Sequence, residues 1–147
     1  MRYATRLCGD VETARDVVQE CFLELCRQRP GDLNGYLRQW LFTVCRNRAF
    51  DQLRKKDGRM TTLEGTEPLV EPTDTLERRE QTGQVLDRVR ELPARQQEVL
   101  RLKFQQGLSY REIAAVIDVS VSNVGFLLHT ALKTLRDRAA EAERSRS

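Results

Sequence analysis

Signals for three consecutive helices, with almost no chain between them, occupy residues 92–135. Pro93 suits the first turn of a helix, because its fixed φ and missing amide proton cost little there. Gly107 can take the left-handed conformation that ends this helix. Ser109 and Glu112 then have the spacing of a capping box, which predicts that a second helix begins at once.

Apolar residues recur within these three helices at the 3.6-residue period of an amphipathic helix. The predicted buried residues are Val99, Leu100, Leu102 and Phe104, then Ile113, Ala114, Val116 and Ile117, then Val121, Val124, Leu128, Ala131, Leu132 and Leu135. Ser120 can cap the third helix, which is the longest. Two helices joined by a tight turn, the second long and amphipathic, indicate a helix-turn-helix, which sets its second helix into the major groove of DNA.

Length and composition favour one or two small soluble domains: the chain has 147 residues, 39% of them hydrophobic and 32% charged. No run approaches the roughly 18 apolar residues of a membrane span. The N-terminus lacks the apolar core of a signal peptide. We therefore expect a cytoplasmic protein with no membrane contact of its own.

The four cysteines are Cys8, Cys21, Cys26 and Cys45, and no two of them form a C-x-x-C pair. Three of them lie among apolar helical positions. Buried thiols are therefore expected rather than a metal or redox site, and we predict no metal and no cofactor.

The net charge of +3 conceals a division along the chain. Basic residues outnumber acidic ones 11 to 7 over residues 1–56 and 13 to 9 over residues 78–147, whereas residues 57–77 hold one basic and six acidic residues. The acidic stretch also contains glycines, prolines and threonines without periodicity, which is typical of a flexible linker. Two basic modules on an acidic tether fit a polyanionic partner, although ordinary solvated surface around a loop would look the same.

A helix is predicted from Thr13 to Arg27, because its apolar residues share one face. That face holds Ala14, Val18, Cys21, Phe22 and Leu25, and the opposite face holds Asp16, Gln19, Glu20, Leu23, Glu24 and Arg27. An acidic face is a poor DNA contact, and Leu23 among carboxylates indicates a protein contact. The alternative is a solvated face with one stray leucine.

A second long helix is predicted from about Asn34 to Lys56, after a break at residues 30–32. Its expected buried stripe is Leu37, Leu41, Val44, Cys45, Ala49 and Leu53. A neighbouring stripe is Tyr36, Trp40, Thr43, Asn47, Asp51 and Arg54, followed by Lys55, Lys56 and Arg59, with Arg46 and Arg48 alongside. Rings, amides and cations together suit unstacked bases and phosphates, although Trp40 alone is more often a core residue.

Four short motifs carry a family resemblance. They are DVVQECF at 16–22, WLF at 40–42 with Asn47 and Asp51, LP at 92–93 and SYREIA at 109–114. In this order and spacing they resemble a bacterial RNA polymerase sigma factor of the sigma-70 family, extracytoplasmic-function (ECF) type, over roughly residues 9–56 and 85–138. The resemblance implies an all-α fold of two small helical domains: sigma region 2 over residues 1–56, a flexible linker over 57–84, a helix-turn-helix sigma region 4 over 85–140, and a tail over 141–147.

The resemblance also implies a transcription initiation factor that directs core polymerase to promoters and assists their opening. The implied polymerase-binding residues, on the clamp helices of the β′ subunit, are Asp16, Gln19, Glu20 and Leu23. Those implied for the melted −10 element are Tyr36, Arg38, Trp40, Asn47, Asp51, Arg54, Lys55 and Lys56. Those implied for the duplex −35 element are Ser109, Tyr110, Arg111, Ser122, Asn123, Phe126, His129 and Lys133. Further implied partners are the β flap and an anti-sigma factor.

Two features depart from the family pattern. Family members usually begin with a further helix before the segment that matches Met1–Tyr3, so this chain is expected to be short by about one helix. The recognition helix carries Gly125, Phe126, Leu127 and Thr130 where basic or hydroxyl residues are common. Phe126 can meet thymine methyl groups, or it can pack on a neighbouring domain or an inhibitor protein.

An enzyme is not expected. The one histidine, His129, lies on the outward side of the recognition helix, with no phosphate loop, carboxylate pair or metal-ligand cluster beside it. The alternative function is a stand-alone helix-turn-helix regulator of operator DNA. Such a regulator needs neither the docking motif on the first long helix nor the aromatic stripe on the second.

Overall fold

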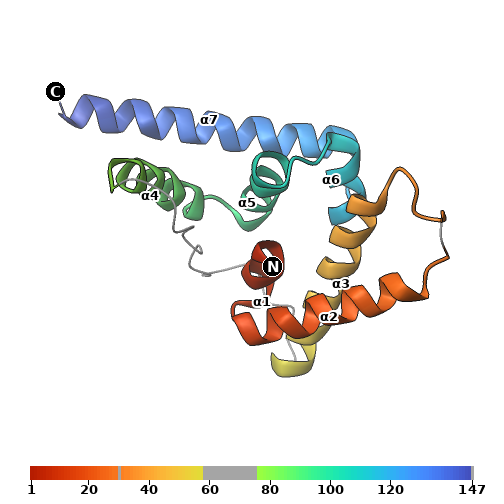
Figure 1. Ribbon diagram of the computed structural model, residues 1–147. Helices are drawn as coiled ribbons and strands as arrows, with labels where there is room; N and C mark the ends of the chain where they lie inside the picture. The colour runs from red at the N-terminus through yellow and green to blue at the C-terminus, as the bar shows by residue number, and fades with distance from the viewer. Residues whose placement is uncertain (30, 58–75, 147) are drawn as a thin grey trace. The chain divides into compact units, whose positions relative to one another are not determined.

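The computed structural model describes residues 1–29, 31–57 and 76–146, and every regular element in these ranges is helical. The all-α prediction is confirmed. The chain divides into two compact units. One is built on α1 (Arg2–Cys8), α2 (Val11–Arg27) and α3 (Leu37–Asp57) (Figure 1). The other is built on α4 (Leu76–Arg90), α5 (Ala94–Leu100), the π-helical turn η1 (Arg101–Gln105) and α7 (Val121–Arg146), with the start of α6 (Tyr110–Ile117); Ala115–Asp118, at the end of α6, are grouped with the first unit.

The first unit opens with α1, which the sequence analysis did not predict. Its end is set by Gly9, whose φ of 82° is the left-handed conformation that favours glycine. Asp10 then caps α2: its carboxylate accepts from the Thr13 amide and the Thr13 hydroxyl, each over 2.7 Å. The two helices therefore meet at a turn that the local sequence specifies fully.

The core of this unit lies where α1, α2 and α3 pack together. Its buried residues are Tyr3, Ala4, Leu7, Cys8, Ala14, Val17, Cys21 and Ala49. The Tyr3 ring meets the Phe42 ring edge-on, with centroids 5.1 Å apart, and so joins α1 to α3.

Two predictions for these helices need correction. Phe22, assigned to the buried face of α2, is 58% exposed, and Val17 is buried instead, because α1 and α3 cover a face centred nearer Val17 and Cys21. On α3, the expected buried stripe is fully buried only at Ala49, and Leu37 is 43% exposed. The helix also begins at Leu37 rather than Asn34, since residues 31–36 form turns.

The second unit packs α5 against α7, with α4 also touching α7. Its core confirms most of the predicted apolar positions and adds Leu92 and Leu108. Phe104 and Val121 were wrongly placed in it, because they are 65% and 45% exposed at the ends of their helical turns. Gly107 has a φ of 69°, as its predicted role requires.

Two segments expected to be irregular are helical. Residues 76–84 of the predicted linker belong to α4, which contacts α7 and whose Val89 is buried. Most of the predicted tail continues α7, which ends at Arg146. The rest of the predicted linker, together with Arg59, lies outside the described residues apart from Asp57.

Candidate functional sites

The exposed face of α2 is smaller than the sequence indicated. Asp16, Gln19 and Leu23 are exposed, and they fall on one side of the helix because they are three and four residues apart. Leu23 is 60% exposed. These three residues form a small surface with an apolar centre, here called the α2 face.

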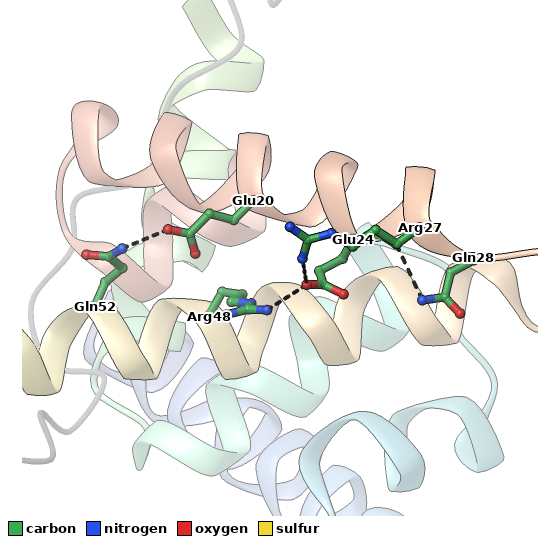
Figure 2. Close-up of polar contacts among 6 residues, drawn as sticks. All are labelled: Glu20, Glu24, Arg27, Gln28, Arg48 and Gln52. Atoms are coloured by element: carbon green, nitrogen blue, oxygen red, sulfur yellow. Dashed lines mark hydrogen bonds and ion pairs between the residues drawn. The ribbon is translucent and has the colours of Figure 1, made fainter.

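Two other carboxylates of this helix, Glu20 and Glu24, turn toward α3 (Figure 2). Glu20 is half-buried and accepts a hydrogen bond from the Gln52 side chain over 3.1 Å. Glu24 accepts from Arg27 on its own helix over 2.7 Å and from Arg48 on α3 over 3.0 Å. Glu20 was placed on the face opposite the apolar one, and only that placement is corrected: the residue is half-buried and its carboxylate helps to join two helices. Its assignment to polymerase docking stays a prediction.

The aromatic and amide stripe of the second long helix is partly exposed. Asn47, Asp51 and Arg54 are exposed along α3, and Trp40 is half-buried. Tyr36 is 48% exposed in the turn before the helix, and its hydroxyl donates to the backbone oxygen of Asp32. We call this surface the α3 stripe.

The cations beside the α3 stripe are not equivalent. Arg48 forms an ion pair with Glu24, and the Arg46 guanidinium lies 4.6 Å from the Phe50 ring centroid. Arg54 lies 3.9 Å from Asp51, and both side chains are more than half exposed. Arg38 and Lys55 are exposed, and the side chain of Lys56 lies outside the described residues.

The helix-turn-helix has the predicted caps. The Ser109 amide donates to Glu112 over 3.0 Å, the Glu112 amide donates to the Ser109 hydroxyl over 3.2 Å, and the Asn123 amide donates to the Ser120 hydroxyl over 3.0 Å. The axes of α6 and α7 meet at 102°, within the usual range for this motif. The capping box occupies two amides at the start of α6, so phosphate binding there depends more on Arg111, which is exposed.

One face of α7 is exposed to solvent, and it carries the residues that were expected to contact DNA. Ser122, Phe126, His129 and Lys133 are exposed at i, i+4, i+7 and i+11, with Asn123 beside them. Phe126 is 66% exposed. We call this surface the α7 face; it holds one lysine and a large apolar ring at its centre.

A neighbouring contact was missed by the sequence analysis. The Lys103 ammonium lies 5.3 Å from the centroid of the Tyr110 ring, a cation–π distance. A Cβ on Gly125 would lie 3.8 Å from the same ring, so Tyr110 rests between η1 and α7. The pair joins two separate helical segments, so periodicity within one helix does not predict it.

The described helices are poorly suited to crossing a membrane. No single described helix is long and apolar enough to cross a bilayer. Only α6 and α7 taken together reach that length and apolar character, and they are bent by 102° relative to each other. The apolar side chains of that pair, such as Ile113, Val116 and Leu128, are buried in the protein.

Comparison with known families matches both halves of the chain. Residues 1–59 match the family described as sigma-70 region 2, and residues 82–135 match the family described as sigma-70, region 4. Together the two matches include the α2 face, the α3 stripe and the α7 face.

Relatives and a solved structure agree with these matches. The chain is 34% identical over 142 residues to the ECF RNA polymerase sigma factor SigL of Mycobacterium tuberculosis, covering 92% of this chain and 79% of SigL. It is 27% identical to the ECF sigma factor SigW of Bacillus subtilis, covering 89% and 78%. Among solved structures it resembles the sigma factor RpoE of Bartonella quintana, determined with the anti-sigma factor NepR, with a TM-score of 0.67, 23% identity and coverage of 92% and 86%.

Proposed function

The chain belongs to the sigma-70 family of RNA polymerase sigma factors, in its ECF group, and from this membership we propose that its three exposed surfaces divide polymerase docking and promoter recognition among them. A sigma factor is a transcription initiation factor that directs core RNA polymerase to promoters. The proposal concerns which residues of this chain do so. It assigns region 2 to residues 1–56 and region 4 to residues 85–140.

Polymerase docking is assigned to the α2 face, on the β′ clamp helices. Leu23 supplies the apolar centre, and Asp16 and Gln19 supply a polar rim. Interfaces commonly combine an apolar centre with a polar rim. Glu20 contributes at the edge, because its carboxylate is shared with Gln52.

The melted −10 element is assigned to the α3 stripe. Trp40 and Tyr36 offer rings for unstacked bases, and Asn47 offers a donor and an acceptor for a base edge. Arg38, Arg54, Lys55 and Lys56 supply charge for the backbone. This stripe is the observation that carries the proposal, because a regulator that binds only duplex operators needs no platform for single-stranded bases.

The duplex −35 element is assigned to the α7 face together with Ser109, Tyr110 and Arg111. Phe126 lies at the centre of that face, where an apolar ring can contact thymine methyl groups. Lys133 and Arg111 are exposed and can reach phosphates. Readout here depends on shape and apolar contact more than on arginine.

Further partners follow from the family. Region 4 is assigned to the β flap as well as to DNA, and an anti-sigma factor is a proposed regulator, as in the related complex of RpoE with NepR. The protein acts where polymerase and chromosome are, in the cytoplasm. No catalytic role is assigned to His129 or to any other residue.

Run-off transcription with purified core polymerase tests the proposal directly. The full chain should give specific transcripts from promoters selected by start-site mapping, and core polymerase alone should not. A stand-alone regulator would bind operator DNA without joining core polymerase. Failure to co-purify with core polymerase and to start transcription would overturn the assignment of all three surfaces.

A further inference from the structure

Two cysteines from different helices meet in an apolar groove of the first unit. Cys21 on α2 and Cys45 on α3 both line this groove, which has a volume of about 190 Å³. The Cys45 thiol donates a hydrogen bond to the Cys21 sulfur. Met1 and Phe22 form part of the wall, and each is more than half exposed, so the groove opens to solvent beside them.

This arrangement differs from the buried, inert thiols expected from the sequence. Cys8 and Cys21 are buried, but Cys45 is half-buried and Cys26 is exposed. Cys26 is the most accessible of the four, yet it does not line the groove. Accessibility and pairing therefore distinguish the four thiols in a way that sequence spacing did not.

The two paired thiols are chemically unequal. The hydrogen bond from Cys45 lowers the pKa of Cys21, and the positive charge of Arg48 acts in the same direction, whereas burial and Glu20 oppose them. The same hydrogen bond raises the pKa of Cys45, and burial adds to this effect. The thiolate is the reactive form of cysteine, so Cys21 is the better nucleophile of the pair.

We propose that Cys21 and Cys45 form a dithiol site that hydrogen peroxide or a small organic peroxide converts to a disulfide joining α2 to α3. The Cys21 thiolate attacks one peroxide oxygen, the O–O bond breaks, and Cys21 becomes a sulfenic acid. With hydrogen peroxide, the departing hydroxide takes up the proton that Cys21 released and leaves as water.

The second step closes the bridge. The Cys45 sulfur attacks the Cys21 sulfur, the S–O bond breaks, and the departing hydroxide takes the Cys45 proton and leaves as a second water. Two thiols and one hydrogen peroxide thus give one disulfide and two waters. The two sulfurs together lose two electrons, and the peroxide gains them.

The packing of α2 on α3 favours an internal bridge over other products. The bonds from Glu20 to Gln52 and from Glu24 to Arg48 join the same two helices, so the two thiols stay opposed. The groove is several times larger than the roughly 30 Å³ that one water molecule occupies in the liquid, so a small peroxide has room beside the thiols. Bridging then requires the hydrogen-bonded sulfurs to close to about 2.05 Å.

Mass spectrometry of the full chain tests the proposal without any polymerase, so its result is independent of the assigned docking and DNA surfaces. The Cys26→Ser variant is the parent protein, because Cys26 shares a tryptic fragment with Cys21 and is free to link two chains. After hydrogen peroxide and thiol blocking, we expect the loss of two hydrogens and of two reactive thiols. Digestion should then yield residues 16–27 linked to residues 39–46, and dithiothreitol should reverse the change.

Matched variants identify the partners. Adding Cys45→Ser should remove the bridge and leave a Cys21 sulfenic acid that dimedone traps, whereas adding Cys8→Ala should leave the bridge intact. A Cys8–Cys45 bridge, irreversible oxidation of Cys21 without a bridge, or four unlinked cysteines in oxidised wild-type protein would each overturn the proposal. The wild-type and parent results decide it even if a variant fails to fold.

Discussion

Arg48 on α3 donates to Glu24 on α2 over 3.0 Å, so a cation that the sequence places beside the α3 stripe joins two helices instead (Figure 2). Glu24 also accepts from Arg27, which makes it the centre of a three-residue cluster. Arg48 thus joins α3 to α2, whereas Arg54 pairs with Asp51 within α3.

Replacing Arg48 with alanine should therefore lower the free energy of unfolding. Exposed ion pairs contribute about 0.2–1 kcal/mol, and we expect a loss near the upper end, because the Glu24 side chain is 24% exposed and that of Arg48 is 40% exposed. Arg54→Ala is the matched control: its pair with Asp51 is longer, at 3.9 Å, and more exposed. Urea unfolding of both variants measures the difference, and equal losses would contradict the distinction.

Asp16→Lys should weaken binding to core polymerase by about tenfold or more, equivalent to roughly 1.4 kcal/mol, without loss of helical content. Asp16 is exposed on the α2 face, whereas the same change at Glu20 would also break the contact with Gln52. Glu141→Lys, an exposed acid near the end of α7, makes the same charge change away from every assigned residue. Fluorescence anisotropy with labelled protein gives both affinities, and equal weakening by the two variants would remove Asp16 from the docking surface.

Features that depend on residues close together in the sequence were predicted correctly, and features that depend on contacts between helices were not. Caps at Ser109 and Ser120 and the turn at Gly107 were predicted correctly, because each depends on residues within one helical turn. The exposure of Phe22 and the pairing of Glu20 were not, because both depend on how α1 and α3 pack on α2. Periodicity locates the apolar face of a helix to within about one residue. Packing against neighbouring helices determines which residues at the edges of that face are buried.

The same limit applies to the candidate sites. The grouping of residues into stripes on α3 and α7 followed from spacing along single helices. The contact between Lys103 and Tyr110 was not predicted, since it joins η1 to α6. The pairing of Cys21 with Cys45 likewise joins two helices and has no signature in either.

Ser120→Ala should destabilise the second unit by about 1 kcal/mol, because the Ser120 hydroxyl caps α7 by accepting from the Asn123 amide over 3.0 Å. Ser122→Ala, two residues later on the exposed surface of the same helix, should change stability by less than about 0.5 kcal/mol. Thermal unfolding followed by circular dichroism compares them. If the Ser120 cap does not stabilise α7, the two variants should have the same melting temperature.

Trp40→Ala and Asn47→Ala should reduce promoter opening more than duplex binding, since stacking of an unpaired base on an aromatic side chain is worth about 1–3 kcal/mol. Asn47 is exposed, so its loss should not affect folding; Trp40 is half-buried, so its unfolding must be measured as well. Gln105→Ala, which removes an exposed amide from η1, is the control. Permanganate footprinting reports the melted bases, and normal melting with Asn47→Ala would make that amide a solvated surface group.

The composition of the α7 face predicts a weak dependence of −35 binding on salt. Each phosphate neutralised by a lysine or arginine contributes about −0.9 to the slope of log K against log salt concentration. Arg111, Lys133 and Arg136 are the exposed cations on or near this face, so region 4 should contribute a slope of magnitude about 3 or less.

Phe126→Arg should steepen that slope by about one and strengthen binding to duplexes of any sequence, because a new cation would face phosphate at the centre of the α7 face. Phe104→Arg is a close control. Phe104 is 65% exposed and Phe126 is 66% exposed, and both belong to the second unit, but Phe104 lies on η1, outside the α7 face. Filter binding of the full chain to a duplex, repeated over a salt series, separates the two variants. If both leave the slope unchanged, and Phe126→Arg instead weakens binding to an anti-sigma factor, then Phe126 belongs to a protein interface and the α3 stripe must carry most of the promoter specificity.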